Sequence, residues 1–199
     1  PSVQPALHGR LLWSLTDDGV LSLSLRLRRT LGFPSLPRLG LRLFLPESMS
    51  RVDYYGLGPQ ESYVDKRRAS YHGAFSADVV DLHEDYIRPQ ENGSHADCNK
   101  VVLSGGGLSL AAVGPTPFSF NASRYTQEEL AARHRNTDLT PSGSTVLCLD
   151  AAMAGIGSNS CGPALRPRYQ VDSQELGMEL HLLLNPLITH ASTHNEVTL

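Results

Sequence analysis

Seven carboxylate side chains in loop-like stretches are the groups of this sequence best suited to acid–base chemistry: Glu61, Asp65, Asp81, Glu84, Asp85, Glu91 and Asp97. Two carboxyl groups about 5–5.5 Å apart support glycoside hydrolysis with retention, and a separation of about 6.5–9.5 Å supports inversion. A sequence does not reveal such distances, and solvated loops commonly carry carboxylates. The residues by themselves therefore favour a loop surface over a catalytic pair.

Cysteine and histidine are the other reactive types. Cys98, Cys148 and Cys161 stand far apart, without a CxxC pair or the Cys/His spacing of a zinc site. We interpret them as free thiols in a reducing cytoplasm. A Cys/His dyad at Cys161 stays open, although most such cysteines are inert. His83 and Glu84 could ligate a metal, but adjacent side chains on an extended chain point to opposite faces, so we predict no metal site.

Two glycine-rich stretches raise the question of a phosphate loop: SGGGL at 104–108 and GIGSNSCGPA at 155–164. Neither continues into the Lys-Ser/Thr of a P-loop, and neither opens a clear helix after a strand. The first is predicted to be a hairpin turn that uses the positive φ of glycine. The second is compatible with a turn or with the rim of a binding site. The nucleophile motif G-x-S-x-G does not occur.

Composition narrows the class of protein. The 199 residues carry a formal charge of −3, with 40% hydrophobic and 19% charged residues, as in an ordered soluble domain without affinity for nucleic acid. No apolar run approaches the ~20 residues that span a bilayer, so we expect no membrane partner. The chain starts at Pro1 without a methionine or signal peptide. We interpret it as a piece of a longer protein.

The elements that must position these residues are mostly strands. Leucine occupies every second place in LSLSLRLR at 21–28, the period of a strand with one buried face. Similar segments lie at 41–45, 51–55, 100–104, 108–113, 118–120, 144–150 and 176–184, with turn signals between them. This pattern predicts an all-β antiparallel sandwich over residues 1–184, and a frayed tail at 185–199. We expect Trp13 in a buried strand.

One short helix is predicted at 126–134. Thr126 is followed three places later by Glu129, which is the pattern of a capping box, and strong helix formers come next. We expect this helix to close one end of the sandwich.

Four segments in order carry a family resemblance: YYGLGPQESYVDK at 54–66, YIRPQENG at 86–93, FSFNASRYTQEEL at 118–130 and GIGSNSCGP at 155–163. Together they resemble the C-terminal domain of the large bacterial β-galactosidases of glycoside hydrolase family 2. The clear resemblance covers about 51–169. It implies a large antiparallel supersandwich related to galactose mutarotase, which agrees with the alternation.

The resemblance also implies a division of labour. The acid/base and nucleophile glutamates of the family, with their magnesium and sodium ions, lie in an upstream TIM barrel. This chain is therefore expected to hold no catalytic residue, metal or cofactor, and to be inactive by itself. Its expected partners are the remaining domains of a cytoplasmic, homo-oligomeric β-galactosidase and the galactoside substrate.

The last domain of the family contributes one wall of the active-site mouth. At the position matching Cys161, well-known members carry a tryptophan on which the glucose or acceptor sugar stacks, so Ser158, Asn159, Ser160 and Cys161 are expected on a substrate rim. A tryptophan buries about 150–250 Å². If a third of that area meets sugar, stacking contributes on the order of 1–2 kcal/mol. Cysteine supplies no such platform, so we expect the enzyme to hold its aglycone more loosely or to hold a different aglycone.

The other motif residues are interpreted as scaffold: Gly58, Pro59, Glu61, Glu91, Asn92, Gly93 and Tyr125. Gly58–Pro59 is expected to form a turn that lets Gln60 and Glu61 bond backbone, and Asn92–Gly93 a hairpin turn. An arginine common in the family is replaced by Asn99, which leaves the ion pairing of Asp97 open.

Two alternatives remain at this point. A free-standing carbohydrate-binding module would be expected to expose aromatic side chains, and Trp13 is the chain's one tryptophan. An aldose epimerase on the related fold would need a glutamate base and a histidine acid, which the four motifs do not supply.

Overall fold

The computed structural model describes residues 6–156 and 163–186. Within these residues the chain forms antiparallel strands, three 3-10 turns and one short helix, which confirms the predicted all-β class. The strands are β1 (Leu7–Leu15), β2 (Val20–Arg29), β3 (Arg38–Pro46), β4 (Arg51–Gly58), β5 (Tyr71–Asp78), β6 (Ser94–Gly105), β7 (Leu108–Ser123), β8 (Ser144–Met153) and β9 (Glu175–Pro186). The 3-10 turns are η1 (Val79–Leu82), η2 (Asn136–Asp138) and η3 (Pro167–Tyr169), and the helix is α1 (Gln127–Ala132).

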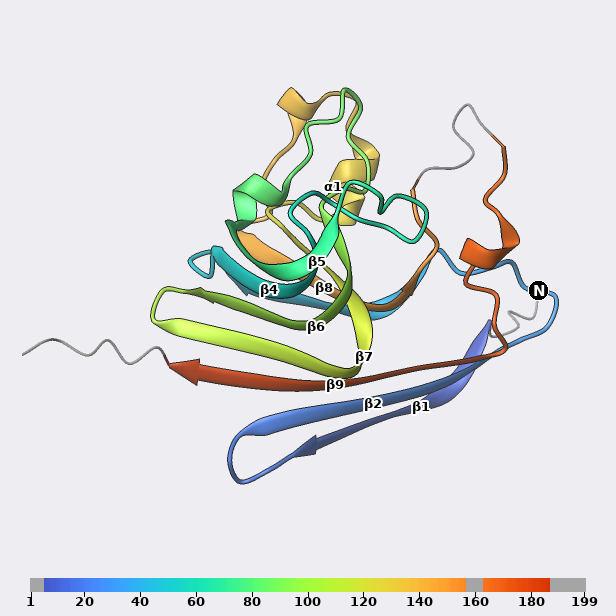
Figure 1. Cartoon of the computed structure of the whole chain (residues 1–199), viewed down its shortest axis with the longest axis horizontal. Helices are drawn as coiled ribbons and strands as arrows, with labels where there is room; N and C mark the ends of the chain where they lie inside the picture. Colours follow the sequence, from blue (N-terminus) through green and yellow to red (C-terminus); the bar gives the residue numbers. More distant parts are fainter. Residues whose placement is uncertain (1–5, 157–162, 187–199) are drawn as a thin grey trace, which may run out of the picture.

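The sheet folds over along its longest strand, β7. The order is β1-β2-β9-β7-β6-β4-β5, with β8 attached to β7 and β3 to β8. The first half of β7 pairs with β9 and the second half with β8, so this strand joins the lower and upper parts of the molecule in Figure 1. The two strands predicted at 108–113 and 118–120 are thus one strand. Pro115 and Pro117 lie between its two paired parts, where a missing N–H donor costs no ladder bond.

The leucine alternation of β2 becomes the inner face of the sheet. Leu23 of β2 lies opposite Leu180 of β9, and both are buried. Phe120 and Leu149, which face each other across β7 and β8, are fully buried in the same core. Burying a large apolar side chain contributes roughly 1.5–3 kcal/mol, so these positions hold the two parts of the sheet together.

Strand β1 extends the apolar inner face of the sheet past the part that other described residues cover. Leu11, Trp13 and Leu15 pair with Leu25, Leu23 and Leu21 of β2 and so share the core face, yet they are 48%, 45% and 70% exposed. The prediction that Trp13 is buried is therefore wrong. Among the described residues, only β2 pairs with β1. An alternating sequence shows which face is apolar and cannot show where the covering layer ends.

Helix α1 is shorter than its predicted span. The Thr126 hydroxyl accepts the Glu129 N–H at 3.1 Å, as a helix cap does. The Glu129 carboxylate turns forward and accepts from Arg133 and from the Thr140 N–H. Arg133 is already extended, with φ −95° and ψ 150°, so the helix ends at Ala132.

The predicted glycine hairpin joins β6 to β7. Gly105, Gly106 and Gly107 have φ values of 138°, 59° and 79°, which other residues rarely adopt. The turn is thus structural. In the described part of the chain, no helix is long and apolar enough to cross a membrane.

Candidate functional site

The carboxylate of Glu61 joins two loops, the one that follows β4 and the one that precedes β6, at the end of the molecule that carries α1 (Figure 1). Its Oε2 accepts the Gly93 N–H at 2.7 Å, and its Oε1 accepts from Lys66 and from the Tyr86 hydroxyl. The side chain is 3% exposed, and the Gly58–Pro59 peptide just before it is cis. A buried carboxylate with three donors cannot easily take a substrate proton, and it serves to hold the loops together.

Asn92 and Gly93 end an irregular loop and do not form the predicted hairpin turn, because no strand of the structure directly precedes them. The buried Asn92 side chain accepts the Glu84 N–H at 3.0 Å and donates to the Gln90 carbonyl at 2.9 Å. Asn121 of β7 donates to the Asn92 carbonyl. The pair therefore connects the loop to the inner sheet, through interactions that a sequence pattern does not display.

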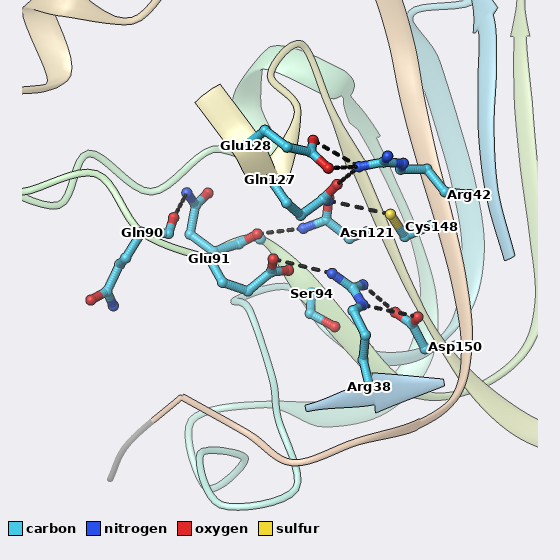
Figure 2. Close-up of polar contacts among 12 residues, drawn as sticks. Arg38, Arg42, Gln90, Glu91, Ser94, Asn121, Gln127, Glu128, Cys148 and Asp150 are labelled. Atoms are coloured by element: carbon cyan, nitrogen blue, oxygen red, sulfur yellow. Dashed lines mark hydrogen bonds and ion pairs between the residues drawn. The ribbon is translucent and has the colours of Figure 1, made fainter. Parts of the chain in front are cut away.

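Arg38 of β3 lies between two acidic side chains, as Figure 2 shows. Its Nε donates to Asp150 at 3.1 Å, and its Nη1 donates to Glu91 at 3.2 Å. Burial raises the pKa of both carboxyl groups, and the guanidinium opposes that rise. Arg38 thus links the loop of residues 83–93 to the end of strand β8. Sequence reasoning missed Arg38, since a lone basic residue in a strand gives no sign of its partners.

A hollow of about 330 Å³ lies next to Arg38, between β3, β8 and α1. Arg42 on its wall donates to Gln127 and Glu128, and Gln127 donates to the Cys148 sulfur at 3.3 Å. Both guanidiniums facing this hollow are already paired with carboxylates. It therefore offers little attraction to an anionic ligand.

Strand β8 leads from this network directly into the glycine-rich segment of residues 155–163. The Ala154 N–H donates to the Pro37 carbonyl at 2.9 Å. The next residue, Gly155, has φ 85° and packs on the Asp65 carboxylate, which accepts the Ile156 N–H at 3.4 Å. The predicted rim residues Ser158, Asn159, Ser160 and Cys161 lie outside the described residues.

The remaining candidate groups are dispersed or paired. Asp97 has φ 53° at a bulge of β6 and forms an ion pair with Arg67, so Asn99 does not leave it unpaired. Cys98 and Cys148 are buried free thiols. The Tyr125 N–H donates to Ser123 at 3.0 Å. Within residues 6–156 and 163–186, no group of three His, Cys, Asp or Glu side chains could hold a metal.

The fold and these contacts define a class: an antiparallel β domain whose buried polar residues hold loops in place at one end. Its family follows from sequence comparison. The family described as beta galactosidase small chain matches residues 2–184, and the chain belongs to that family.

Curated relatives agree with this assignment. The chain is 40% identical over 186 residues to a beta-galactosidase of Actinobacillus pleuropneumoniae and 38% identical over 181 residues to one of Staphylococcus xylosus. Each match covers 91% of this chain and 18% of the relative. Beta-galactosidase 2 of Enterobacter cloacae is 32% identical over 178 residues, which is 89% of this chain and 17% of the relative. The chain thus spans less than a fifth of the relatives it matches and corresponds to one domain of a β-galactosidase.

Proposed function

We propose that this chain is the non-catalytic C-terminal domain of an enzyme that hydrolyses terminal β-D-galactosyl groups, and that it forms part of the aglycone side of the active-site rim. The observation that carries the proposal is the coverage: the match takes up 91% of this chain but only 18% of a β-galactosidase. The remaining four-fifths leave ample room for a catalytic domain, with its carboxylates and its magnesium and sodium ions.

The described carboxylates support a scaffold role. Glu61 accepts three hydrogen bonds, Asp97 pairs with Arg67, and Asp150 pairs with Arg38. A general acid or nucleophile must instead be free to meet the substrate. The domain is then proposed to bind and orient the aglycone. Such binding raises turnover only where its interactions are stronger in the transition state than in the bound substrate.

Complementation tests this division of labour. The purified chain should not hydrolyse a chromogenic β-galactoside, whereas mixing it with the upstream catalytic portion should restore or raise hydrolysis. A Gly155→Val variant of the chain is the comparison. Its side chain is strained at a φ of 85°, so this variant should complement less well than the parent chain. Turnover by the chain without the upstream portion would refute the non-catalytic role.

The rim itself is tested at Cys161. Cys161→Trp in the whole enzyme adds an aromatic platform of about 150–250 Å², and should lower the KM for lactose and raise the ratio of transfer to hydrolysis. Cys161→Ser is the control, because it changes polarity without adding area. Unchanged values in the tryptophan variant would contradict a rim position.

The whole enzyme is further proposed to be a cytoplasmic homo-oligomer in which this domain contacts the remaining domains. The strip of Leu11, Trp13 and Leu15 supports such contacts, because an exposed apolar strip of this kind is typical of an interface.

A carbohydrate-binding module is the second candidate, favoured by one observation: Trp13 is 45% exposed. Calorimetric titration of the chain with galactose and lactose tests it, with Trp13→Leu as the control. Sugar binding that disappears in Trp13→Leu would support this alternative over the rim proposal. Leucines flank Trp13 on the same strip, so contact with protein explains the exposure of Trp13 better than contact with sugar.

A further inference from the structure

Two motifs that lie far apart in the sequence meet at Asp65. One Asp65 oxygen accepts the Ile156 N–H at 3.4 Å, and the same carboxylate packs against the Cα of Gly155. We propose that Asp65 is a positioning residue: it fixes the direction in which the chain leaves β8 and enters the glycine-rich segment. This inference rests on the proposed function, which assigns that segment to the aglycone side of the rim.

The turn that carries Asp65 is well held. The Tyr63 N–H donates to the Lys66 carbonyl at 2.8 Å, and the Lys66 N–H donates back to Tyr63 at 3.1 Å, so Asp65 sits in a closed four-residue turn. Tyr63 is 2% exposed, and the Lys66 ammonium is paired with Glu61. Two anchors on either side leave Asp65 little freedom, and a positioning group requires such a support.

The chain on the opposite side of the contact is equally constrained. Ala154 is hydrogen-bonded to Pro37, and a Cβ on Gly155 would overlap the Asp65 carboxylate. Only glycine permits this close approach, and its φ of 85° is a conformation that other residues rarely adopt. The Pro37 carbonyl, just before β3, and the Asp65 carboxylate therefore set the position of residues 154–156, where the chain leaves β8 and enters the segment.

Asp65 is proposed to affect substrate binding and to have no part in the galactosyl chemistry. Asp65 lies in a chain that is proposed to be non-catalytic, so its loss should alter how the aglycone is held and leave galactosyl chemistry intact. Small displacements of binding groups remote from the reacting atoms are enough to weaken binding and orientation. A purely structural role would instead lower thermal stability and affect all substrates alike.

The test compares Asp65→Ala, Asp65→Asn and the exposed control Asp81→Ala in the whole β-galactosidase. Hydrogen exchange of the Ile156 amide, read from overlapping peptides by mass spectrometry, should accelerate about tenfold in Asp65→Ala, since it loses its acceptor. Asp65→Asn retains an acceptor oxygen and should restore slow exchange. The KM for lactose should rise several-fold in Asp65→Ala, with kcat for an aryl galactoside within about twofold of the parent.

The possible outcomes distinguish the two proposals. Unchanged exchange at Ile156 would overturn the role of Asp65, whatever the kinetics show. Faster exchange with unchanged lactose kinetics would retain the anchor and contradict the rim position of the segment. An equal drop in kcat on every substrate, or the same effects in Asp81→Ala, would indicate a general structural defect and overturn the positioning role.

Discussion

The Gly93 backbone N–H donates a 2.7 Å hydrogen bond to the buried carboxylate of Glu61. This bond joins the loop that follows β4 to the loop that precedes β6. Gly93 has φ 72°, and a Cβ there would overlap the Leu82 carbonyl. Two short motifs of the sequence are therefore two sides of one contact, on which the loops at this end of the domain depend.

Replacing Glu61 should destabilise the domain. Glu61→Gln removes the charge that Lys66 faces and supplies an N–H where Oε1 or Oε2 now accepts. Leaving buried partners unsatisfied costs about 2–4 kcal/mol of unfolding free energy, which urea denaturation measures. Glu84→Gln, at an exposed carboxylate in the loop that precedes β6, should stay within about 0.5 kcal/mol of the parent. Equal stability of the two variants would contradict the role of Glu61.

Removing one member of the Arg38–Asp150 ion pair should strongly lower the unfolding free energy. Arg38→Met leaves the 2%-exposed Asp150 carboxylate without its cation, and such a loss is expected to lower the unfolding free energy by about 3–5 kcal/mol. Arg38→Met combined with Asp150→Leu should recover part of that loss in a double-mutant cycle.

The exposed pair of Arg26 with Glu179 is the matched control for this cycle. Its side chains are 70% and 41% exposed, so Arg26→Met should cost no more than about 1 kcal/mol. A similar loss at both arginines would show that burial does not determine the strength of the Arg38 pair.

Stability should fall as the pH is lowered from 6.5 toward 4. Burial lowers the pKa of His95 from 6.5 to about 4. Between these values the unfolded chain binds a proton that the folded chain does not, so acid favours unfolding. The slope is at most about 1.4 kcal/mol per pH unit, or on the order of 3 kcal/mol over the window.

Urea denaturation at several pH values measures this slope. His95→Gln should flatten it, whereas His134→Gln, at an exposed histidine, should leave it unchanged. The NMR resonances of the His95 ring in the parent protein provide a second measurement, which does not depend on the variant folding. Titration of that ring near pH 6.5 in the folded protein would contradict the lowered pKa of His95.

Thiol reactivity should separate Cys161 from the other two cysteines. Burial raises the pKa of Cys98 to about 12 and that of Cys148 to about 11, so both are protonated and shielded at pH 8. The proposed rim position would expose Cys161, so with a disulfide reagent the native chain should show one fast thiol and the denatured chain three. Cys161→Ser should abolish the fast phase. Fast reaction of two thiols would mean that β6 or β8 opens readily.

The strip on β1 should make the separate chain associate. Leu11→Thr, Trp13→Thr and Leu15→Thr combined remove exposed apolar area and introduce β-branched residues, which suit a strand. Sedimentation should show a smaller weight-average mass than for the parent chain. A triple substitution of Ser22, Ser24 and Arg28 to threonine on the polar face of β2 is the control. Equal masses in all three proteins would exclude association through the strip.

Much of the fold could be predicted from local pattern. Leucine at every second position of β2 identified both the strand and its buried face, because that period is intrinsic to an extended chain. Thr126 likewise predicted the start of α1, since a cap bonds its own neighbours. The glycines at 105–107 predicted the turn between β6 and β7. In each case the cause lies within a few residues of the effect.

Properties that depend on distant residues could be decided only by the tertiary structure. The sequence shows that Trp13 belongs to an apolar face, but not that the cover ends before it. It contains Asp65 and Gly155 in separate motifs, and only the folded sheet brings them together. Arg38, Glu91 and Asp150 become one network in the same way. Periodicity is a local property of the chain, whereas burial and pairing arise where segments far apart in sequence meet.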